Sequence, residues 1–382
     1  MINRLLMFAR DPGGANVIFP LADAFSNRGY EVVLRGKDIA LNRFRAQGLG
    51  GSDLASVPDD INLDNITSWI KQARPQAVIT GTSADDPTEK YIWKACMHLG
   101  IPSFAVLDQW MNFGIRFSPY GLAQAVQYKQ RKEHPFLPTM ILAMDENARQ
   151  GLMADGIDAD RIAVVGHPYL EWLARKSREM LNEGVNQRVR STLRVDPDEM
   201  LITFASEPLS RDYGGEERAR EYWGFTEDTI IRELVEALSG DGVEARKRIK
   251  FVVKLHPREE RSKYAYINQD NCGLEPIIIG DEIPAVDLIT ASDYIIGMSS
   301  MFLLEAVVIG KPVTSIMIGL QRENPFILDR LGILTSIRTK EDLRKTINSI
   351  ISLEGFPVID IRVAEGAADN IVKVVEGYIC RN

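Results

Sequence analysis

The fold is decided at the start of the chain by the stretch LLMFARDPGG, residues 5–14. Its first five residues are apolar, and its last five form a polar turn that ends in two glycines. Val17, Leu21 and Phe25 then recur at the spacing of an amphipathic helix. An uninterrupted apolar strand followed by a helix is typical of a parallel sheet that is covered on both faces.

The same unit of strand, turn and helix recurs along the chain in two series. The first series predicts strands at 5–9, 31–34, 77–80, 103–107 and 140–144, with helices near 64–73, 87–99 and 146–155. The second predicts strands at 201–205, 251–254, 276–279, 294–296 and 313–317, with helices near 227–239, 285–291, 301–309 and 340–352. We therefore expect an α/β protein with two doubly wound, Rossmann-like parallel sheets and a ligand cleft at the carboxyl ends of their strands.

The segment IAVVGHP, residues 162–168, separates the two series and precedes a charged helical stretch, 170–193. We place the domain boundary there, with an N-terminal domain at 1–168 and a C-terminal domain at 169–382. The last helix, near 363–378, is free to pack back on the N-terminal domain. A length of 382 residues agrees with two domains.

Composition excludes several classes of protein. The 45 lysines and arginines against 53 aspartates and glutamates give a net charge of −8, which disfavours binding to nucleic acid. A hydrophobic fraction of 45% argues against a disordered chain, and three cysteines fit a reducing compartment. The longest apolar stretch, 294–313, is interrupted by polar side chains, and the start of the chain shows no cleavable leader. We therefore expect a cytoplasmic protein.

Chemistry is expected first in the loop 11–16, after the first strand. Gly13 and Gly14 permit a sharp turn and let a ligand approach the N–H groups at the start of the next helix, which favour anions. The GxGxxG pattern of dinucleotide sites is absent. The alternative is an ordinary turn in which Asp11 or Asn16 caps the helix.

A second candidate is the motif KLHPR at the end of a predicted strand. His256 there would donate a hydrogen bond to a phosphate oxygen, and Lys254 and Arg258 would add positive charge. The loop after the first strand of the second series carries Ser206 and Arg211 to the same rim, where Arg211 can reach an anion. The alternatives are a histidine hydrogen-bonded within the protein and a solvated loop.

A third candidate is IIGMSS, residues 295–300, in which Ser299 and Ser300 open a predicted helix. Hydroxyls and free N–H groups at a helix start can cradle a phosphate. Glu305 is the only charge in the apolar run 301–310, so it needs a partner. That partner is either the diol of a ribose or a neighbouring basic side chain, and the serines are otherwise plain helix caps.

Together, these C-terminal motifs resemble those of the GT-B superfamily of glycosyltransferases and the related non-hydrolysing UDP-N-acetylglucosamine 2-epimerases. The resemblance covers the whole chain as architecture, and specific motifs only over residues 250–313; segment 164–168 is similar to the hinge entry of that superfamily. The His-Pro and Ser-Ser motifs are similar to a motif pair of bacterial sialyltransferases and CDP-glycerol glycerophosphotransferases. This resemblance implies that His256, Ser299 and Ser300 hold the phosphate of a nucleotide-activated donor.

The stretch 299–313 is also similar to the epimerases' Ser-Gly-Gly segment, which continues through a glutamate to Gly-Lys-Pro-Val. This match assigns Glu305 to the nucleotide ribose. Other epimerase motifs are changed. Their Gly-Thr-Arg-Pro-Glu start is RDPGG here, and their second glycine is Ser300. Their His-Arg-Arg-Glu-Asn loop is matched only weakly, at 211–214. The acidic motif of the bacterial sialyltransferases is not evident. These departures favour transfer over epimerisation.

The acceptor side is expected in LDQWMNF, residues 107–113, after a strand of the first series. Asp108 is a candidate general base for an acceptor hydroxyl, and Asp11 is its rival. Trp110 and Phe113 would offer an apolar platform to a sugar ring. The alternative is that Asp108 caps a turn and that both aromatic side chains belong to the core.

These residues predict a GT-B-like enzyme that transfers a sugar or a polyol phosphate from a CMP-, CDP- or UDP-linked donor to a saccharide or lipid-linked acceptor in surface-polysaccharide synthesis. The alternatives are a UDP-N-acetylglucosamine 2-epimerase-like enzyme and a non-catalytic scaffold that binds nucleotide sugars. The four histidines lack metal-ligand spacing, so we expect neither a metal nor a cofactor besides the donor. Peripheral membrane contact, and the choice between monomer and homodimer, are left open.

Overall fold

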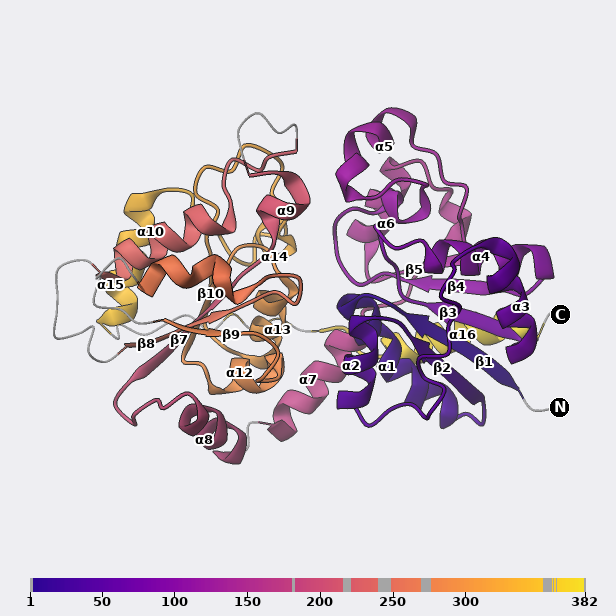
Figure 1. The fold of residues 1–382 in the computed structure, drawn as a ribbon, viewed down its shortest axis with the longest axis horizontal. Coiled ribbons are helices and arrows are strands. Elements are labelled where there is room, and N and C mark those ends of the chain that lie inside the picture. The colour runs from indigo at the N-terminus through magenta and orange to yellow at the C-terminus, as the bar shows by residue number, and fades with distance from the viewer. Residues whose placement is uncertain are drawn as a thin grey trace. The chain divides into compact units, whose positions relative to one another are not determined.

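The computed structural model describes residues 3–180, 183–215, 221–239, 249–268, 276–352, 359, 361 and 363–380. The chain divides into two compact units, which we call unit 1 (Met1–Trp172 with Ala364–Asn382) and unit 2 (Leu173–Val363). The division falls at Trp172, close to the expected boundary at residue 168, and the last segment joins unit 1, the packing that the sequence left open for the last helix. Each unit is built around its own parallel sheet (Figure 1).

Unit 1 holds a six-stranded parallel sheet in the order β2-β1-β3-β4-β5-β6. The strands are β1 (Arg4–Ala9), β2 (Glu31–Gly36), β3 (Ala77–Thr80), β4 (Ser103–Val106), β5 (Met140–Ala143) and β6 (Ile162–Val164). Every residue of β3 and β4 is buried, as expected of strands that are covered on both faces. Strand β6 lies in the segment that we expected only to link the domains. It is a short edge strand of three apolar residues, and its Val164 is 46% exposed.

The helices of unit 1 connect these strands. They are α1 (Pro12–Ser26), α2 (Ile39–Ala46), α3 (Leu63–Ala73), α4 (Thr88–Leu99), α5 (Ala125–Arg131), α6 (Glu146–Ala154), α7 (Pro168–Met180, which continues into unit 2) and α16 (Ala367–Ile379), with 3₁₀ turns at Gly114–Phe117, Leu122–Gln124 and Ala159–Arg161. Helices α2 and α5 were not predicted. Helix α2 buries only Ala40 and Phe44, a single pair at helical spacing, and α5 buries only Tyr128, so neither shows the longer apolar periodicity that predicts a helix.

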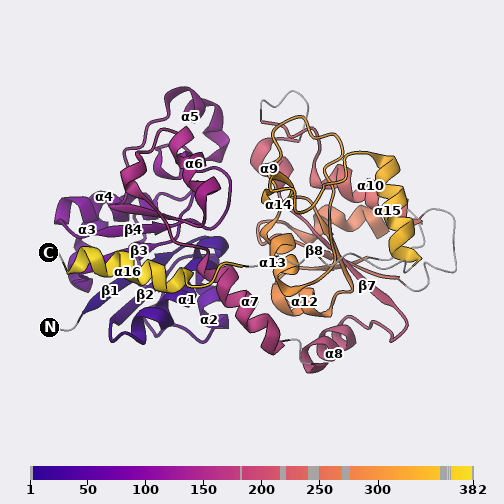
Figure 2. The same ribbon diagram turned by 180° about the vertical axis from the view of Figure 1, so that it is seen from behind.

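Helix α16 packs on the sheet of unit 1 (Figure 2). The ring of Tyr378 meets Phe104 of β4 edge to face, with 5.6 Å between centroids. The start of the helix is capped by Glu171, whose carboxylate accepts hydrogen bonds from the N–H groups of Gly366 (2.7 Å) and Ala368 (3.2 Å). The end of the chain is thus an integral part of unit 1.

Unit 2 holds a five-stranded parallel sheet in the order β11-β10-β7-β8-β9. The strands are β7 (Met200–Ala205), β8 (Ile249–Lys254), β9 (Ile277–Ile279), β10 (Tyr294–Gly297) and β11 (Val313–Ser315). The helices are α8 (Glu183–Thr192), α9 (Leu209–Tyr213), α10 (Glu227–Ser239), α12 (Ala285–Ala291), α13 (Met301–Ile309), α14 (Ile327–Arg330) and α15 (Lys340–Ile351), with a 3₁₀ segment, η4, at Arg261–Asn268. The charged stretch 170–193, expected as one helical segment, is divided between α7 and α8. Helix α13 is apolar on nearly all sides and largely buried, which is typical of a helix in a domain interior.

The strand order decides which loops meet in each unit. In unit 1, β1, β3 and β4 are neighbours, so the residues that follow them gather at one edge of the sheet. In unit 2 the residues after β10, β7 and β8 gather in the same way. In sheets of this kind the carboxyl edge is where ligands bind.

Candidate functional site

The site in unit 1 begins with helix α1, which starts at Pro12 soon after β1. The expected loop 11–16 is therefore largely the first turn of the helix, and Pro12 suits its first position because the φ angle of proline is already helical. Asp11 stands at the N-cap, but its carboxylate does not cap the helix. It accepts instead from Nη1 of Arg10 at 2.7 Å. Asn16, the other predicted cap, lies inside the helix.

Gly13 and Gly14 are required by close packing rather than by an unusual backbone angle. A Cβ atom on Gly13 would lie 1.9 Å from Oδ2 of Asp108. A Cβ atom on Gly81, just after β3, would lie 2.6 Å from Cα of Gly14. The two glycines of α1 therefore let the segments after β3 and β4 approach the start of the helix.

Replacing Gly13 with alanine should displace the Asp108 carboxylate, because the new methyl group would overlap it. We expect the free energy of unfolding to fall by about 1–3 kcal/mol, the usual cost of overpacking. Gly377→Ala is the matched control, since this helical glycine of unit 1 has open space where a Cβ atom would lie. Denaturant unfolding should show the control unchanged or slightly more stable. Equal losses in the two variants would contradict the packing argument.

Asp108 follows β4 and is 3% exposed. Its Oδ1 atom accepts hydrogen bonds from Nη1 of Arg116 at 2.9 Å and from the hydroxyl of Thr82 at 3.3 Å. Arg116 also donates to the Thr82 hydroxyl oxygen at 2.6 Å. Burial raises the pKa of Asp108, and the positive charge of Arg116 opposes that rise. The candidate base is thus held in place by an internal ion pair.

Sequence reasoning missed Glu89, in the first turn of α4, which is fully buried. Neither of its carboxyl oxygens has a hydrogen-bond partner among the residues that the structure describes. Burial, together with the negative charges of Asp11 and Asp86, raises its pKa to about 8. At neutral pH Glu89 is therefore a protonated acid within electrostatic reach of Asp11. Its only sequence signal is its place in the acidic stretch DDPTE, where nothing marks it as pointing inward.

The two aromatic side chains of the predicted acceptor site pack inside unit 1. Trp110 is 9% exposed, and its ring stacks on His167 with 5.5 Å between centroids. Its Nε1 donates to Oδ2 of Asp145 at 2.7 Å. Phe113 lies so close to Gly151 that a Cβ atom on that glycine would be 2.2 Å from the ring. The alternative that both belong to the core fits this packing better than an open platform for a sugar.

In unit 2 the two serines of the predicted phosphate cradle stand at the start of α13, with Ser300 at the N-cap. Their partner is Glu207, which follows the neighbouring strand β7. Its Oε1 accepts from the N–H of Ser299 at 2.6 Å, and its Oε2 accepts from the Ser299 hydroxyl at 2.9 Å. Burial raises the pKa of Glu207 to about 7, although these hydrogen bonds lower it. Glu207 is the second functional candidate that sequence reasoning missed.

His256 lies after β8, close to the three basic side chains that the sequence placed at the same rim. Its Nδ1 accepts from the N–H of Arg258 at 3.2 Å, so the ring hydrogen is on Nε2. Burial and the positive charges of Arg258, Lys254 and Arg211 lower its pKa to about 3. The ring is therefore neutral at physiological pH and offers Nε2–H as a donor.

The basic side chains around this histidine are partly neutralised. Arg258 forms a two-point ion pair with Asp212, at 3.1 and 2.6 Å. Lys254 pairs with Asp281 at 3.0 Å. Arg211 is exposed and donates to the carbonyl oxygen of Arg258 at 3.1 Å. The structure thus brings His256 together with the three basic side chains that were predicted for this rim.

Two further predicted donor contacts are internal. Ser206 is 4% exposed, and its hydroxyl is hydrogen-bonded with the hydroxyl of Tyr264 and the carboxylate of Glu259. A ligand could reach Ser206 only by breaking this network, so we correct its assignment to that of a structural hydroxyl. Glu305 is 5% exposed within α13, and its contact with a ribose stays a prediction.

Among the described residues, no group of three or more histidine, cysteine, aspartate or glutamate side chains is arranged to hold a metal ion. In that part of the chain, no helix combines the length and apolar character needed to cross a membrane.

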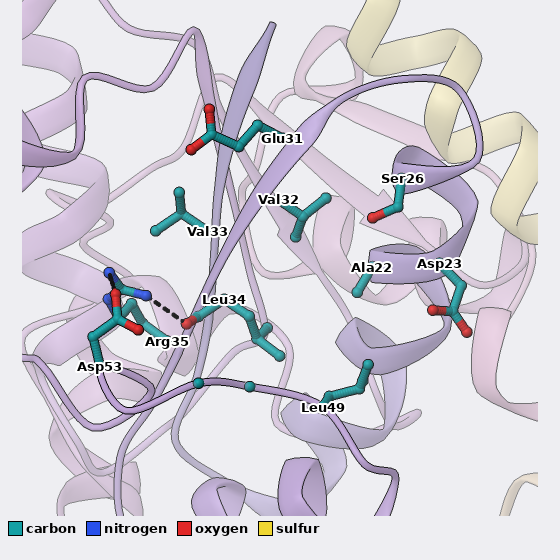
Figure 3. A pocket seen from close by; sticks show the side chains of 12 residues that line it. Ala22, Asp23, Ser26, Glu31, Val32, Val33, Leu34, Arg35, Leu49 and Asp53 are labelled. Atoms are coloured by element: carbon teal, nitrogen blue, oxygen red, sulfur yellow. Dashed lines mark hydrogen bonds and ion pairs between the residues drawn. The ribbon is translucent and has the colours of Figure 1, made fainter. Parts of the chain in front are cut away.

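A separate pocket of about 420 Å³ opens in unit 1 along the edge strand β2 (Figure 3). Its walls are residues 31–35 of the strand, the C-terminal part of α1 and the segment 49–53. Arg35 pairs with Asp53 on one side of it at 2.5 Å. None of the predicted site residues lines this pocket.

The two parallel-sheet α/β domains give the chain a GT-B-like fold. No protein-family model matches the sequence. No curated protein matches it either.

Solved structures match over nearly the whole chain. The UDP-GlcNAc 2-epimerase from Neisseria meningitidis, bound to UDP-GlcNAc, has a TM-score of 0.65 at 16% identity, over 98% of this chain and 100% of that one. The putative UDP-N-acetylglucosamine 2-epimerase from Listeria monocytogenes has a TM-score of 0.66 at 15% identity, over 100% and 98%. Alr3699/HepE from Anabaena, in complex with UDP-glucose, has a TM-score of 0.59 at 14% identity, over 99% and 98%. At these identities the similarity establishes the fold.

Proposed function

We propose that this protein is an enzyme of the UDP-N-acetylglucosamine 2-epimerase kind, acting on a UDP-linked amino sugar. The similarity in fold to epimerases over nearly the whole chain supports this function better than the transfer reaction that the sequence motifs favoured. The observation that carries nucleotide binding is the geometry at His256. A neutral imidazole offers Nε2–H as a donor beside Arg258, Lys254 and Arg211.

This arrangement suits the diphosphate of a UDP-sugar. Phosphate oxygens accept hydrogen bonds, and the Nε2–H of His256 donates one without a change of charge near neutral pH, since its pKa is about 3. The basic side chains supply the positive charge. When the bond between sugar and phosphate breaks, negative charge grows on the leaving UDP, and donors that are already in place stabilise it.

We assign proton transfer to the carboxyl groups of unit 1. Epimerisation that breaks the bond between sugar and phosphate is an elimination followed by an addition. The hydrogen on carbon 2 leaves as a proton and UDP leaves carbon 1, so a double bond forms between these two carbons. UDP then adds back at carbon 1 while a proton returns to the opposite face of carbon 2, so the reaction needs a base and an acid. Asp108 and Asp11 are each ion-paired with an arginine, and Glu89 is protonated at neutral pH. No cofactor besides the sugar nucleotide enters this proposal.

Transfer to a saccharide or lipid-linked acceptor is the second candidate function. It is favoured by the changed motifs, because the epimerases' His-Arg-Arg-Glu-Asn loop is matched only weakly at 211–214 and their second glycine is Ser300 here. Incubation with UDP-GlcNAc, followed by NMR, separates the two functions. The 2-epimer, with or without free UDP, supports epimerisation, whereas UDP release that requires an added saccharide supports transfer. Binding with neither product supports the non-catalytic scaffold.

His256→Ala should weaken UDP binding by about 10- to 100-fold. The substitution removes one hydrogen bond to a charged group, worth about 1.5–3 kcal/mol. Isothermal titration calorimetry measures the effect. His98→Ala is the control, since this exposed histidine lies in the last turn of α4. Equal dissociation constants for wild type and His256→Ala would rule out the assignment of His256 to the phosphate.

A further inference from the structure

Glu207 supplies a negative charge at the start of α13, whose own first turn holds no acidic residue. Its carboxylate accepts from the N–H and the hydroxyl of Ser299, at 2.6 and 2.9 Å, and also from the N–H of Ser300. Glu207 is 9% exposed, so these contacts are largely shielded from water. In proteins, backbone N–H groups at a helix start are a common binding place for phosphate.

We infer that Glu207 holds the position of a ligand phosphate at the start of α13 and competes with the diphosphate of the nucleotide for these donors. A carboxylate and a phosphate both present acceptor oxygens and negative charge, so the same donors cannot serve both at once. A diphosphate binds at α13 only after Glu207 takes up a proton or turns away. This inference rests on the proposed function, because the diphosphate is that of a UDP-sugar.

Ser300 gives an independent indication that α13 receives a further acceptor. Its hydroxyl oxygen is buried and has no hydrogen-bond partner among the described residues. A buried hydroxyl without a partner costs free energy. A phosphate oxygen at the start of α13 would accept its hydrogen, whereas the carboxylate of Glu207 is already engaged by Ser299.

The charge of Glu207 is adjustable near neutral pH. Burial raises its pKa to about 7, the hydrogen bonds from the start of α13 lower it, and the negative charge of Glu259 raises it. Glu259 is itself paired with Lys263 of η4 at 2.8 Å. His256, with a pKa of about 3, keeps the same charge from pH 6 to pH 8. Protonation of Glu207 over this range therefore releases the donors of α13.

The test measures UDP-GlcNAc binding by calorimetry at pH 6 and pH 8. Both phosphates of this probe are esterified, so its own charge is constant over this range. Wild type should bind about 10-fold more tightly at pH 6 than at pH 8, as follows from a group that titrates near pH 7. Glu207→Gln should bind at pH 8 about as tightly as wild type at pH 6. Glu236→Gln, at an exposed position of α10, is the control and should follow the wild type.

The outcomes distinguish this inference from the proposed function. Wild-type binding that is independent of pH overturns the inference and leaves the proposed function standing, as does binding by Glu207→Gln that is no tighter than wild type at pH 8. If no protein binds UDP-GlcNAc, the proposed function fails, and sulfate becomes the probe. Sulfate that shifts the amide NMR signals of Ser299 and Ser300 in Glu207→Gln, but not in wild type at pH 8, still supports the inference. No shift in either protein overturns it.

Discussion

Replacing Glu89 with glutamine is expected to raise the free energy of unfolding by about 3 kcal/mol at pH 7, because it removes the cost of keeping this buried acid protonated. The folded pKa of Glu89 is about 8, and the ordinary value for glutamate is 4.5. The folded state therefore binds the proton more tightly than the unfolded chain does. The tighter binding of this proton stabilises the folded state fully below pH 4.5, and the stabilisation is lost as the pH rises towards 8.

Over that window the wild type should accordingly lose about 1.4 kcal/mol per pH unit more than Glu89→Gln does, since the other titrating groups are common to both proteins. Unfolding by guanidinium at about pH 5, 6, 7 and 8 gives the free energy of unfolding of both proteins as a function of pH. Glu341→Gln is the control, because that side chain of α15 is 78% exposed. Profiles that run parallel in wild type and Glu89→Gln would show that Glu89 is ionised in the fold.

The elements with continuous apolar runs were predictable from the sequence. The prediction of a helix at 301–309 coincides with α13, and that of a strand at 77–80 coincides with β3. Both are buried on nearly all sides, so only apolar residues are tolerated at most positions and the pattern is plain. Helix α9 lies in the stretch that we predicted as a loop at the rim of the sheet; it buries only Leu209 and so leaves no such pattern.

Glu207 was not predictable because its contact depends on the order of the strands. The sheet of unit 2 places β7 beside β10, which brings the residue two positions after β7 to the start of α13. The local pattern of apolar residues does not determine the order of the strands in the sheet. The residue type was no guide either, since an acidic residue after a strand is also common in solvated loops.

The role of a polar or aromatic side chain was uncertain for a related reason. Ser206 and Trp110 are residue types that suit a ligand and an internal partner equally well. In the structure Ser206 meets Tyr264, and Trp110 meets Asp145, both far along the chain. The basic surroundings of His256 were predictable because Lys254 and Arg258 are close to it in sequence, and Arg211 alone had to be placed by the sheet.

Asp108 and Arg116 are expected to be strongly coupled in their effect on stability. Each side chain is 4% exposed, and the two are joined at 2.9 Å. Removing one partner leaves a buried charge unpaired, so Asp108→Asn and Arg116→Met should each cost about 3–5 kcal/mol, and the double variant should cost less than their sum. A double-mutant cycle by denaturant unfolding measures the coupling. The exposed pair Glu236–Arg344 is the control, with an expected coupling below about 1 kcal/mol.

The same variants separate a structural role of Asp108 from a chemical one. If Asp108 is the base, Asp108→Asn should abolish turnover of UDP-GlcNAc under conditions in which the variant remains folded. Arg116→Met should retain turnover but shift the pH–rate profile to higher pH, because the positive charge of Arg116 opposes the rise in the pKa of Asp108. Without that charge the carboxyl group gives up its proton only at higher pH. If the pH–rate profile of Arg116→Met matches that of the wild type while its free energy of unfolding falls, Asp108 has a structural role in unit 1 and Asp11 remains the candidate base.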